Sequence, residues 1–344
     1  MSAPPVTVFF HPRQLDHRPV YEWAFGDKLA HPETSGRAEN ILGALNAEPT
    51  GFTVRTPTEI PEALLRTVHD PRLSTVYRSA CSSVEAGATY YPSVFPKRHQ
   101  NKPDPTNLNQ SGFFCFDSGT PLTSLTWEAA AWSAASALEA ARIVQKGEAR
   151  VAYSLSRPPG HHASRDLFGG YCYFNNAAVA ATRFEGRGKL AILDIDFHHG
   201  NGTQAMFYRD PNVLFISIHG DPATFYPYFS GYASERGAGE GEGFTMNLPL
   251  PTGTDGQEYV GVLERVVIPA LRTFNPAALI VSAGFDTYRD DPIGRFTLDT
   301  DDFARVGSVL GRLALPTVVV QEGGYRVDAL GRNVVSFLRG MSER

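Results

Sequence analysis

Five short motifs contain the residues that could do chemistry, and each follows a run of apolar residues. The motifs are RPPGHH (157–162), DIDFHHGNG (194–202), HGD (219–221), GFD (284–286) and EGGY (322–325). Five of the ten histidines of the chain lie between positions 161 and 219. Histidine and aspartate side chains bind divalent metals and transfer protons. Their clustering indicates a metal site or an acid–base site.

Asp196, His198 and Asp286 form the candidate metal-ligand set. Side chains two positions apart in an extended strand point the same way, so Asp194, Asp196 and His198 share one face. Asp286 follows another predicted strand and can complete the set. Three protein ligands with one open position are typical of catalytic Zn²⁺. Because two of the three ligands are carboxylates, Fe²⁺, Co²⁺ and Mn²⁺ remain alternatives by ligand type.

A tandem pair, His161 and His162, follows a stiff Pro-Pro-Gly turn. A buried imidazole needs hydrogen-bond partners, and Asp194 and Asn201 are the expected ones. One ring can take a proton from water and pass it to a leaving amine. Tyr325, which follows two glycines, can donate a hydrogen bond to an oxyanion. These roles suit hydrolysis of an amide.

Alternating strands and helices must position these groups. The pattern predicts strands at 150–156, 189–196, 212–219, 277–285 and 316–324, and helices at 126–147, 175–186, 257–274, 300–314 and 327–340. The helix at 300–314 is expected to begin with a cap at Thr300 or Asp301. Strands without polar alternation are covered on both faces. We therefore expect a single α/β domain over 1–344, with a central, mainly parallel sheet flanked by helices on both faces and ligands beyond the carboxyl ends of its strands.

Residues 82–125 interrupt this alternation. The segment is rich in Pro, Asn, Ser, Gly and aromatic residues. Loops of this length often act as lids or interfaces, although a plain surface loop is the alternative. Its aromatic side chains must pack against the body of the protein or against a second subunit.

Composition excludes several classes of protein. The net charge is −5 and no basic stripe is present, which argues against a nucleic-acid partner. The three cysteines have no CxxC spacing, which excludes a disulfide scaffold and a thiolate zinc finger. Cys172 is expected to be a packed small residue. No stretch approaches the length of a membrane span, and the start of the chain resembles a strand more than a signal peptide. We expect a cytoplasmic protein without a membrane partner.

Taken together, the motifs resemble the histone deacetylase superfamily. FGGYCYFNNAA (168–178), SIHGDP (217–222) and HPETSGRAE (31–39) extend the resemblance beyond the five motifs above. HHGNGTQ (198–204), the GDPATFYPYFSGYA stretch (220–233) and the long segment before residue 126 are most similar to bacterial acetylpolyamine amidohydrolases.

The resemblance implies an arginase-like fold and one Zn²⁺ bound by Asp196, His198 and Asp286. It implies that His162 is the general base and acid, that His161 is an electrostatic partner held by Asp194, and that Tyr325 polarises the substrate carbonyl. It also implies that Tyr171 and Tyr226 line a substrate tunnel and that Arg37 lies at the inner end of this tunnel. The full set of residues that it places along the substrate path is Tyr171, Tyr226, Phe168, Gly170, Gly324 and Arg37.

Two further implications concern a second ion and a second subunit. A structural K⁺ is expected at Asp194, Ser217 and Ile218, shared with Asp196 and His198. A homodimer is expected, in which the 82–125 loop of one subunit narrows the active-site entrance of the other.

The chain departs from the family pattern in two places. His162 faces Asn201 where many eukaryotic members have aspartate, and a neutral partner favours the unprotonated, base-competent imidazole. Polyamine-type members also carry a carboxylate shortly before a Gly-aromatic-aromatic segment, whereas residues 107–112 contain no acid and Lys97, Arg98 and Lys102 lie nearby. The sequence thus supports deacylation more strongly than a preference for polyamines.

The leading hypothesis is a metal-dependent deacetylase acting on a small acylated amine, such as an acetylpolyamine or an acetyl-lysine-like substrate. A ureohydrolase with two metal ions is an alternative, but it needs a carboxylate two residues after Asp286, where Tyr288 stands. A non-catalytic protein that binds acylated ligands is a third hypothesis. Lost ligands would be its signature, and none is lost.

Overall fold

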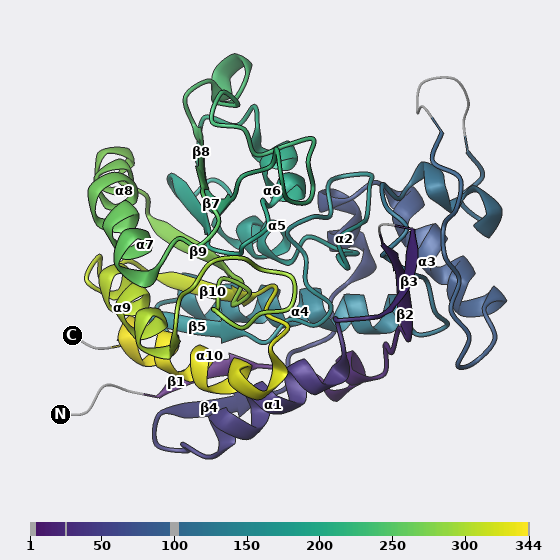
Figure 1. Cartoon of the computed structure of the whole chain (residues 1–344), viewed down its shortest axis with the longest axis horizontal. Coiled ribbons are helices and arrows are strands. Elements are labelled where there is room, and N and C mark those ends of the chain that lie inside the picture. The colour runs from purple at the N-terminus through teal and green to yellow at the C-terminus, as the bar shows by residue number, and fades with distance from the viewer. Residues whose placement is uncertain (1–4, 25, 97–102, 343–344) are drawn as a thin grey trace.

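The core of the molecule is a parallel sheet of eight strands (Figure 1). The structure is a computed structural model that describes residues 5–24, 26–96 and 103–342, so Lys97, Arg98 and Lys102 lie outside the described residues. In spatial order the strands are β4 (Phe52–Arg55), β1 (Val6–Phe9), β5 (Val151–Ser154), β10 (Thr317–Gln321), β9 (Ala278–Ala283), β6 (Leu190–Asp194), β7 (Val213–Gly220) and β8 (Thr245–Leu250). Each neighbouring pair is parallel.

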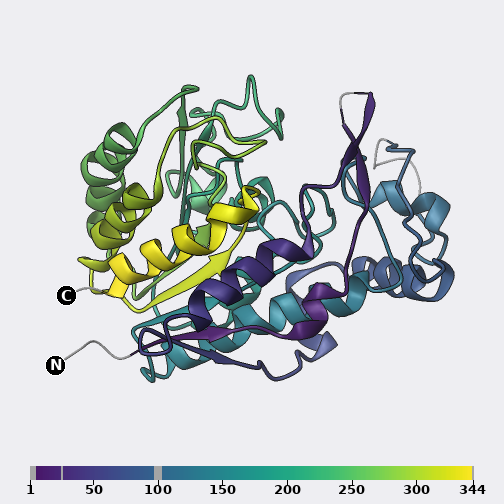
Figure 2. The same cartoon turned by 60° about the horizontal axis from the view of Figure 1, so that its bottom comes forward.

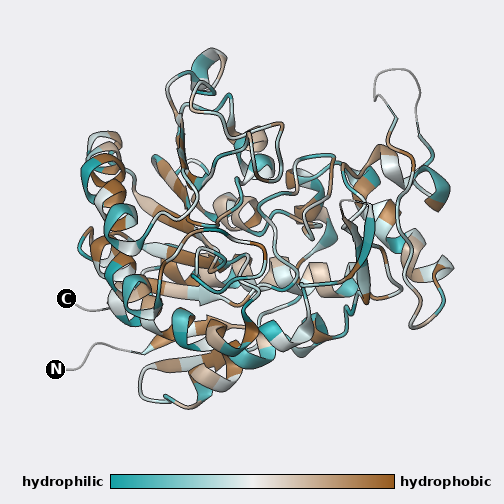
Figure 3. Ribbon diagram, viewed as in Figure 1, coloured by the Kyte–Doolittle hydropathy of each residue, from teal (hydrophilic) through white to brown (hydrophobic). Residues whose placement is uncertain are grey.

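Helices cover both faces of this sheet. One face carries α1 (Ser35–Asn46), α7 (Gly256–Val262), α8 (Ile268–Phe274), α9 (Thr300–Gly311) and α10 (Val327–Ser342), and the other carries α4 (Thr126–Gln145) and α5 (Asn176–Ala181). Within β10, Val319 packs into the first layer while Val318 and Val320 pack into the second. Hydrophobic residues accordingly gather on the central strands (Figure 3). The predicted fold class is confirmed.

Two predicted helices differ in detail. The N-cap of α9 is Asp299, not Thr300 or Asp301, because its carboxylate accepts the N–H groups of Asp301 and Asp302 while Asp302 accepts the N–H of Asp299. This reciprocal pair is a capping box. The helix predicted at 257–274 contains a π-helical stretch, Leu263–Val267, between α7 and α8.

A short hairpin stands apart from the main sheet (Figure 2). It consists of β2 (Tyr21–Ala24) and β3 (Asp27–Ala30), which pair with each other and with no strand of the main sheet. The ring of Tyr21 stacks on Tyr91, with ring centroids 4.6 Å apart, and Ser118 donates a hydrogen bond to the Trp23 carbonyl over 3.0 Å. The hairpin is therefore held by the 82–125 segment.

The 82–125 segment is more ordered than a plain loop. α3 (Pro71–Ser83) reaches its start, a 3₁₀ helix spans Leu108–Phe113, and Tyr90 and Leu122 form a β-bridge. Phe114 and Cys115 are buried with α3 and α4 in a third apolar cluster, to which α2 (Glu62–Val68) also contributes. Within the described residues, no helix has both the length and the apolar character needed to cross a membrane.

Candidate active site

The predicted metal ligands come together beyond the carboxyl ends of two adjacent strands. Asp196 and His198 follow β6, and Asp286 follows β9. One ligand atom from each lies within 4.8 Å of the others. His198 Nδ1 is 2.9 Å from Asp286 Oδ2 and 3.4 Å from Asp196 Oδ1. The geometry thus provides two carboxylates and one imidazole around a single point.

Two glycines make room for these carboxylates. A Cβ atom at Gly284 would lie 2.0 Å from Asp196 Oδ2, and one at Gly323 would lie within 2.6 Å of both Asp196 and Asp286. Burial and the neighbouring Asp196 raise the pKa of Asp286 to about 7. Two buried carboxylates this close are stabilised by a cation between them. The two carboxylates and the imidazole, with the space left by the two glycines, therefore fit a divalent metal.

The tandem histidines have the two predicted partners. His161 Nδ1 lies 2.9 Å from Asp194 Oδ2, and His162 Nδ1 lies 2.7 Å from Asn201 Oδ1. Burial opposes the charged form of His161, but the carboxylates of Asp194 and Asp196 outweigh it and raise the pKa of His161 to about 10. His161 is therefore suited to carrying a positive charge beside the metal ligands.

His162 has the opposite preference. Burial lowers its pKa well below the usual value, and the nearby rings of His161 and His198 lower it further. The Asn201 carbonyl accepts a hydrogen bond, so Nδ1 of His162 carries the proton and Nε2 is left free to accept one. A Cβ atom at Gly170 would lie 2.2 Å from the His162 ring, so only bare backbone fits there.

Tyr325 lies at the edge of this group. It follows β10 in the loop before α10, and Tyr325 and His198 are each 9% exposed as whole residues. Burial raises the pKa of Tyr325 well above its usual value, so the hydroxyl keeps its proton at neutral pH. The Arg37 guanidinium lies 4.7 Å from the centre of the Tyr325 ring, and the Tyr171 ring lies 5.9 Å from it.

Two tyrosine–carboxylate pairs flank the site, and we call them the rim pairs. The Tyr171 hydroxyl donates to Glu22 over 2.8 Å, and the Tyr226 hydroxyl donates to Asp117 over 2.8 Å. The Tyr226 ring is 5.0 Å from the ring of His162. Burial raises the pKa of Glu22, and the neighbouring Asp117 adds to the effect. Among the described residues, no cationic side chain forms an ion pair with Glu22 or Asp117.

Comparisons with known proteins agree with this arrangement. The sequence model described as the histone deacetylase domain matches residues 31–341. The chain belongs to the histone deacetylase family. It is 43% identical to the acetylpolyamine amidohydrolase of Burkholderia pseudomallei over 96% of this chain and 97% of that protein. It is 40% identical to the acetylpolyamine amidohydrolase of Mycoplana ramosa, over 92% and 94% of the two chains.

The solved structures lead to the same family. A crystal structure of acetylpolyamine aminohydrolase from Burkholderia pseudomallei superposes with a TM-score of 0.91 at 42% identity and covers 98% of both chains. The predicted membership of the histone deacetylase superfamily, and the similarity to its acetylpolyamine branch, are confirmed.

Some residues with predicted roles in this histone deacetylase domain lie outside the group. The side chain of Phe168 is fully buried against Tyr77 and Tyr173 in the core, so its ring does not line the site. Ser217 on β7 is the register partner of Asp194, and its hydroxyl lies 2.8 Å from His219 Nδ1. Ile218 is buried beside it. Potassium binding there stays a prediction.

The structure adds carboxylates that sequence reasoning did not single out as site residues. Glu322 accepts the N–H groups of Gly160 and His161 over 2.7 and 3.1 Å and so fixes the histidine turn. Its place in the EGGY motif was the available signal. Glu22 and Asp117 had none, because they meet their tyrosines across 149 and 109 positions.

The buried thiol of Cys172 lies near this turn. A ligand atom from each of His161, Cys172 and Glu322 lies within 4.8 Å of the others. Burial raises the pKa of Cys172 well above its usual value, and its sulfur lies 3.3 Å from the Gly170 carbonyl, to which it donates. A protonated, fully buried thiol is a packing group rather than a nucleophile.

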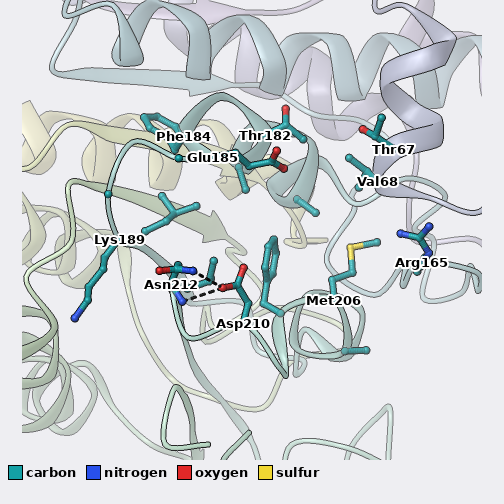
Figure 4. Close-up of a pocket in the computed structure, with 18 residues that line it drawn as sticks. Thr67, Val68, Arg165, Thr182, Phe184, Glu185, Lys189, Met206, Asp210 and Asn212 are labelled. Carbon is teal, nitrogen blue, oxygen red and sulfur yellow. Dashed lines mark hydrogen bonds between the residues drawn. The ribbon is translucent and has the colours of Figure 1, made fainter. Parts of the chain in front are cut away.

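A surface hollow lies near the amino ends of β6 and β7, whereas the candidate site lies beyond the carboxyl ends of the strands (Figure 4). Its volume is about 950 Å³, and its lining includes Lys189 and Leu190 at the amino end of β6 and Asn212 and Val213 at that of β7. Asn212 donates to Asp210 there. None of the predicted site residues lines this hollow.

Proposed function

We propose that the chain is a metal-dependent amidohydrolase that removes the acetyl group from one end of an acetylated polyamine. One observation carries the proposal: the Asp196, His198 and Asp286 cluster lies beside His162, whose Nδ1 is held by Asn201. The names of the most similar relatives support the same chemistry. Zn²⁺ is the proposed metal, with Fe²⁺ or Co²⁺ as alternatives, held by Asp196, His198 and Asp286.

In this proposal the chain's own residues handle the protons. A divalent cation at the three ligands supplies Lewis acidity, which lowers the pKa of a water and polarises a carbonyl. The free Nε2 of His162 accepts a proton as the water attacks the amide carbon. The Tyr325 hydroxyl donates a hydrogen bond to the amide oxygen as negative charge develops there. His162 then gives its proton to the nitrogen of the departing amine, and the C–N bond breaks.

In this proposal His161 and Arg37 assist the reaction through their positive charge. Asp194 favours the protonated form of His161, which would place a positive charge beside the candidate metal ligands. Arg37 is buried against Tyr325, where a short acyl product would lie after cleavage. We propose that Arg37 neutralises part of the charge of the departing carboxylate.

The rim pairs support a cationic substrate. Glu22 and Asp117 accept hydrogen bonds from neutral tyrosines, so their negative charges have no ion-pair partner among the described residues. An ammonium group on the far end of a slender chain would supply one. In this proposal the chain still prefers polyamines although residues 107–112 contain no acid. Glu22 on the β2–β3 hairpin and Asp117 supply the negative charge instead.

The test is a His162→Ala variant assayed with acetylputrescine. We expect kcat to fall at least ~100-fold while the bound metal, measured by elemental analysis, stays at the wild-type level. His69→Ala is the matched control, because His69 is also fully buried but is bonded to Ser164 and Asn175. It should lower the melting temperature and leave turnover intact. Undiminished turnover by the His162 variant would refute the role assigned to this residue.

A substrate panel tests the substrate class. Acetylputrescine, acetylspermidine, an acetyl-lysine peptide and a neutral aryl acetamide are each assayed with Zn²⁺, Co²⁺ and Fe²⁺. We expect the highest kcat/KM for the two polyamines. Equal values for cationic and neutral amides would contradict the polyamine assignment but not the deacetylase one, and binding of every amide without turnover would favour the non-catalytic hypothesis.

We also propose a structural K⁺ at Asp194, Ser217 and Ile218, shared with Asp196 and His198, and a homodimer. The register pairing of Asp194 with Ser217 supports the first. Exposed apolar side chains on the hairpin and the 82–125 segment, including Trp23, Leu29, Val94 and Phe95, support the second. A higher melting temperature in K⁺ than in Na⁺, and a molar mass in solution of twice the 37.6 kDa chain, are the expected results.

A two-metal ureohydrolase is not favoured. The residue two positions after Asp286 is Tyr288, whose ring is buried in the main apolar cluster and whose hydroxyl accepts a hydrogen bond from Arg332 over 3.0 Å. Tyr288 offers no carboxylate for a second metal. Two manganese ions per chain would overturn this conclusion.

A further inference from the structure

The loop that carries Tyr325 is built from flexible residues. It joins β10 to α10 and contains Gly323 and Gly324, and Gly324 has a φ of +112°, which L side chains rarely adopt. Such a loop has many accessible conformations unless other groups restrain it. A tyrosine that must place its hydroxyl within a fraction of an ångström therefore needs a restraint from outside the loop.

A buried cation holds one side of the loop. Arg37, in the first turn of α1, donates from Nε to the Gly324 carbonyl and from Nη2 to the Glu322 carbonyl, each over 2.6 Å. Its Nη1 pairs with Glu33 over 2.9 Å, and both side chains are buried. The guanidinium is thus fixed by a carboxylate before it meets the two carbonyls.

A buried anion holds the other side. Asp291 Oδ2 accepts the N–H groups of Tyr325 and Arg326 over 2.7 and 3.2 Å. Its Oδ1 accepts the N–H groups of Ile293 and Gly294 over 3.0 and 3.1 Å. Asp291 is 6% exposed as a residue, and both of its carboxylate oxygens accept hydrogen bonds from backbone N–H groups. Among the described residues, no ion pair links it to an Arg or Lys side chain.

Both charges act on one peptide group. The carbonyl of Gly324 and the N–H of Tyr325 belong to the same peptide bond, and they point to Arg37 and Asp291 respectively. A peptide group has its negative end at the oxygen and its positive end at the N–H, so a cation and an anion placed in this way both stabilise its orientation. Charge-assisted hydrogen bonds are about twice as strong as neutral ones.

We propose that Asp291 is a positioning residue that, opposite Arg37, clamps the Gly324–Tyr325 peptide and thereby fixes the Tyr325 hydroxyl for the reaction. The inference rests on the proposed function, because it concerns the orientation of Tyr325 during amide hydrolysis. Within the described residues, the Asp291 carboxylate accepts backbone N–H groups and forms no hydrogen bond or ion pair with the side chains of Asp196, His198 or Asp286, although its charge helps to raise the pKa of Asp286. A double-mutant cycle and the metal content therefore distinguish an effect through Tyr325 from one through Asp286.

A double-mutant cycle tests this dependence. Asp291→Asn keeps the size of the side chain but removes the charge and turns one acceptor into a donor. We expect kcat for acetylputrescine to fall ~10- to 100-fold, with KM and metal content near the wild-type values. In a Tyr325→Phe background the same change should lower kcat by less than about twofold, because the hydroxyl it positions is already absent.

Asp302→Asn is the matched control. Asp302 is 7% exposed and also accepts a backbone N–H, that of Asp299 in the cap of α9, and no hydrogen bond or ion pair among the described residues joins its carboxylate to the Tyr325 loop. It should lower the melting temperature without changing kcat beyond about twofold. Equal losses of kcat caused by Asp291→Asn with and without the Tyr325 hydroxyl, or no loss at all, would overturn the proposal.

Two further measurements cover the remaining outcomes. If Asp291→Asn does not fold, Asp291→Glu, which keeps the charge, is tested in the same two backgrounds and judged by the same comparison. Hydrogen exchange of residues 322–326 should be faster in the Asp291 variant than in the wild type and unchanged in the Asp302 variant. This measurement needs no turnover, so a wild-type protein without deacetylase activity would refute the proposed function and still leave the clamp open to test.

Discussion

The buried cluster and the rim pairs differ in how their charged side chains are neutralised. In the buried cluster, made of Asp196, His198 and Asp286 with the tandem histidines, each charged group has a charged neighbour within the protein. In the rim pairs, the hydrogen bonds that the described residues donate to the carboxylates of Glu22 and Asp117 come from neutral hydroxyls and backbone N–H groups. Apart from the proposed metal, the first arrangement balances its charges without a substrate. The second leaves negative charge for a substrate to neutralise.

Removing one of the three candidate metal ligands should have the largest effect, because it should abolish metal binding by the buried cluster. Asp286→Ala takes away a carboxylate that His198 and the Phe197 N–H both contact. We expect bound metal to drop from one ion per chain toward none and turnover to fall below detection, because the remaining two ligands bind weakly. Elemental analysis after gel filtration measures the metal. A variant that kept a full equivalent of metal would show that Asp286 is not a ligand.

Removing one hydroxyl should have the next largest effect. Tyr325→Phe leaves the ring over Arg37 and deletes only the donor. We expect kcat to fall ~100- to 1,000-fold, with KM nearly unchanged and metal content intact, because the lost hydrogen bond forms mainly in the transition state. Steady-state kinetics with acetylputrescine measure both constants. A rise in KM at constant kcat would mean that Tyr325 serves binding instead.

Neutralising a rim acid should change selectivity more than chemistry. For Glu22→Gln we expect KM for acetylspermidine to rise ~10-fold, or about 1.4 kcal/mol, while constants for a neutral aryl acetamide stay the same. Glu85→Gln is the control, because Glu85 is an exposed acid of the 82–125 segment. If kcat/KM fell as much for the neutral amide as for the cationic one, Glu22 would stabilise the structure of the site and would not recognise the charge of the substrate.

The same variant should have a small effect on stability, of opposite sign. Burial raises the pKa of Glu22, so the folded state binds a proton more tightly than the unfolded chain does, and ionisation costs stability above that pKa. Glu22→Gln should therefore melt about 1–3 °C higher than the wild type at pH 8. The gain should vanish at pH 4, where both states of the wild type are largely protonated. Scanning calorimetry at the two pH values distinguishes these outcomes.

The buried cluster could be predicted from sequence because its information is local. Asp194, Asp196 and His198 stand two positions apart at the end of an apolar run, and the turn that bears His161 and His162 is marked by Pro-Pro-Gly. The strands β5, β6, β7, β9 and β10 and the helices between them could be predicted for the same reason, whereas the edge strands β4 and β8 were not predicted. Alternation and motif spacing therefore predicted the strands that carry the site and the chemistry that follows their carboxyl ends.

The rim and the hairpin could not be predicted in this way. β2 and β3 have four residues each, and every residue of β3 is exposed, so neither strand has the hydrophobic pattern of a core element. The contact of Glu22 with Tyr171 spans 149 positions and depends on how the 82–125 segment supports the hairpin. The N-cap of α9 was misplaced by one or two residues because four acidic or hydroxyl residues stand in a row, Asp299 to Asp302, and each residue type can cap a helix.

The separation of the hairpin from the main sheet has a consequence for changing this protein. A two-stranded hairpin is marginally stable alone, and this one depends on the Tyr21–Tyr91 stack and on Ser118. Replacing residues 21–30 alone with those of a relative that has another substrate would therefore leave out the 82–125 residues that support the hairpin. We therefore expect that a transfer of selectivity requires the joint replacement of two discontinuous pieces, 21–30 and 82–125, with the tyrosines that Glu22 and Asp117 contact kept in place.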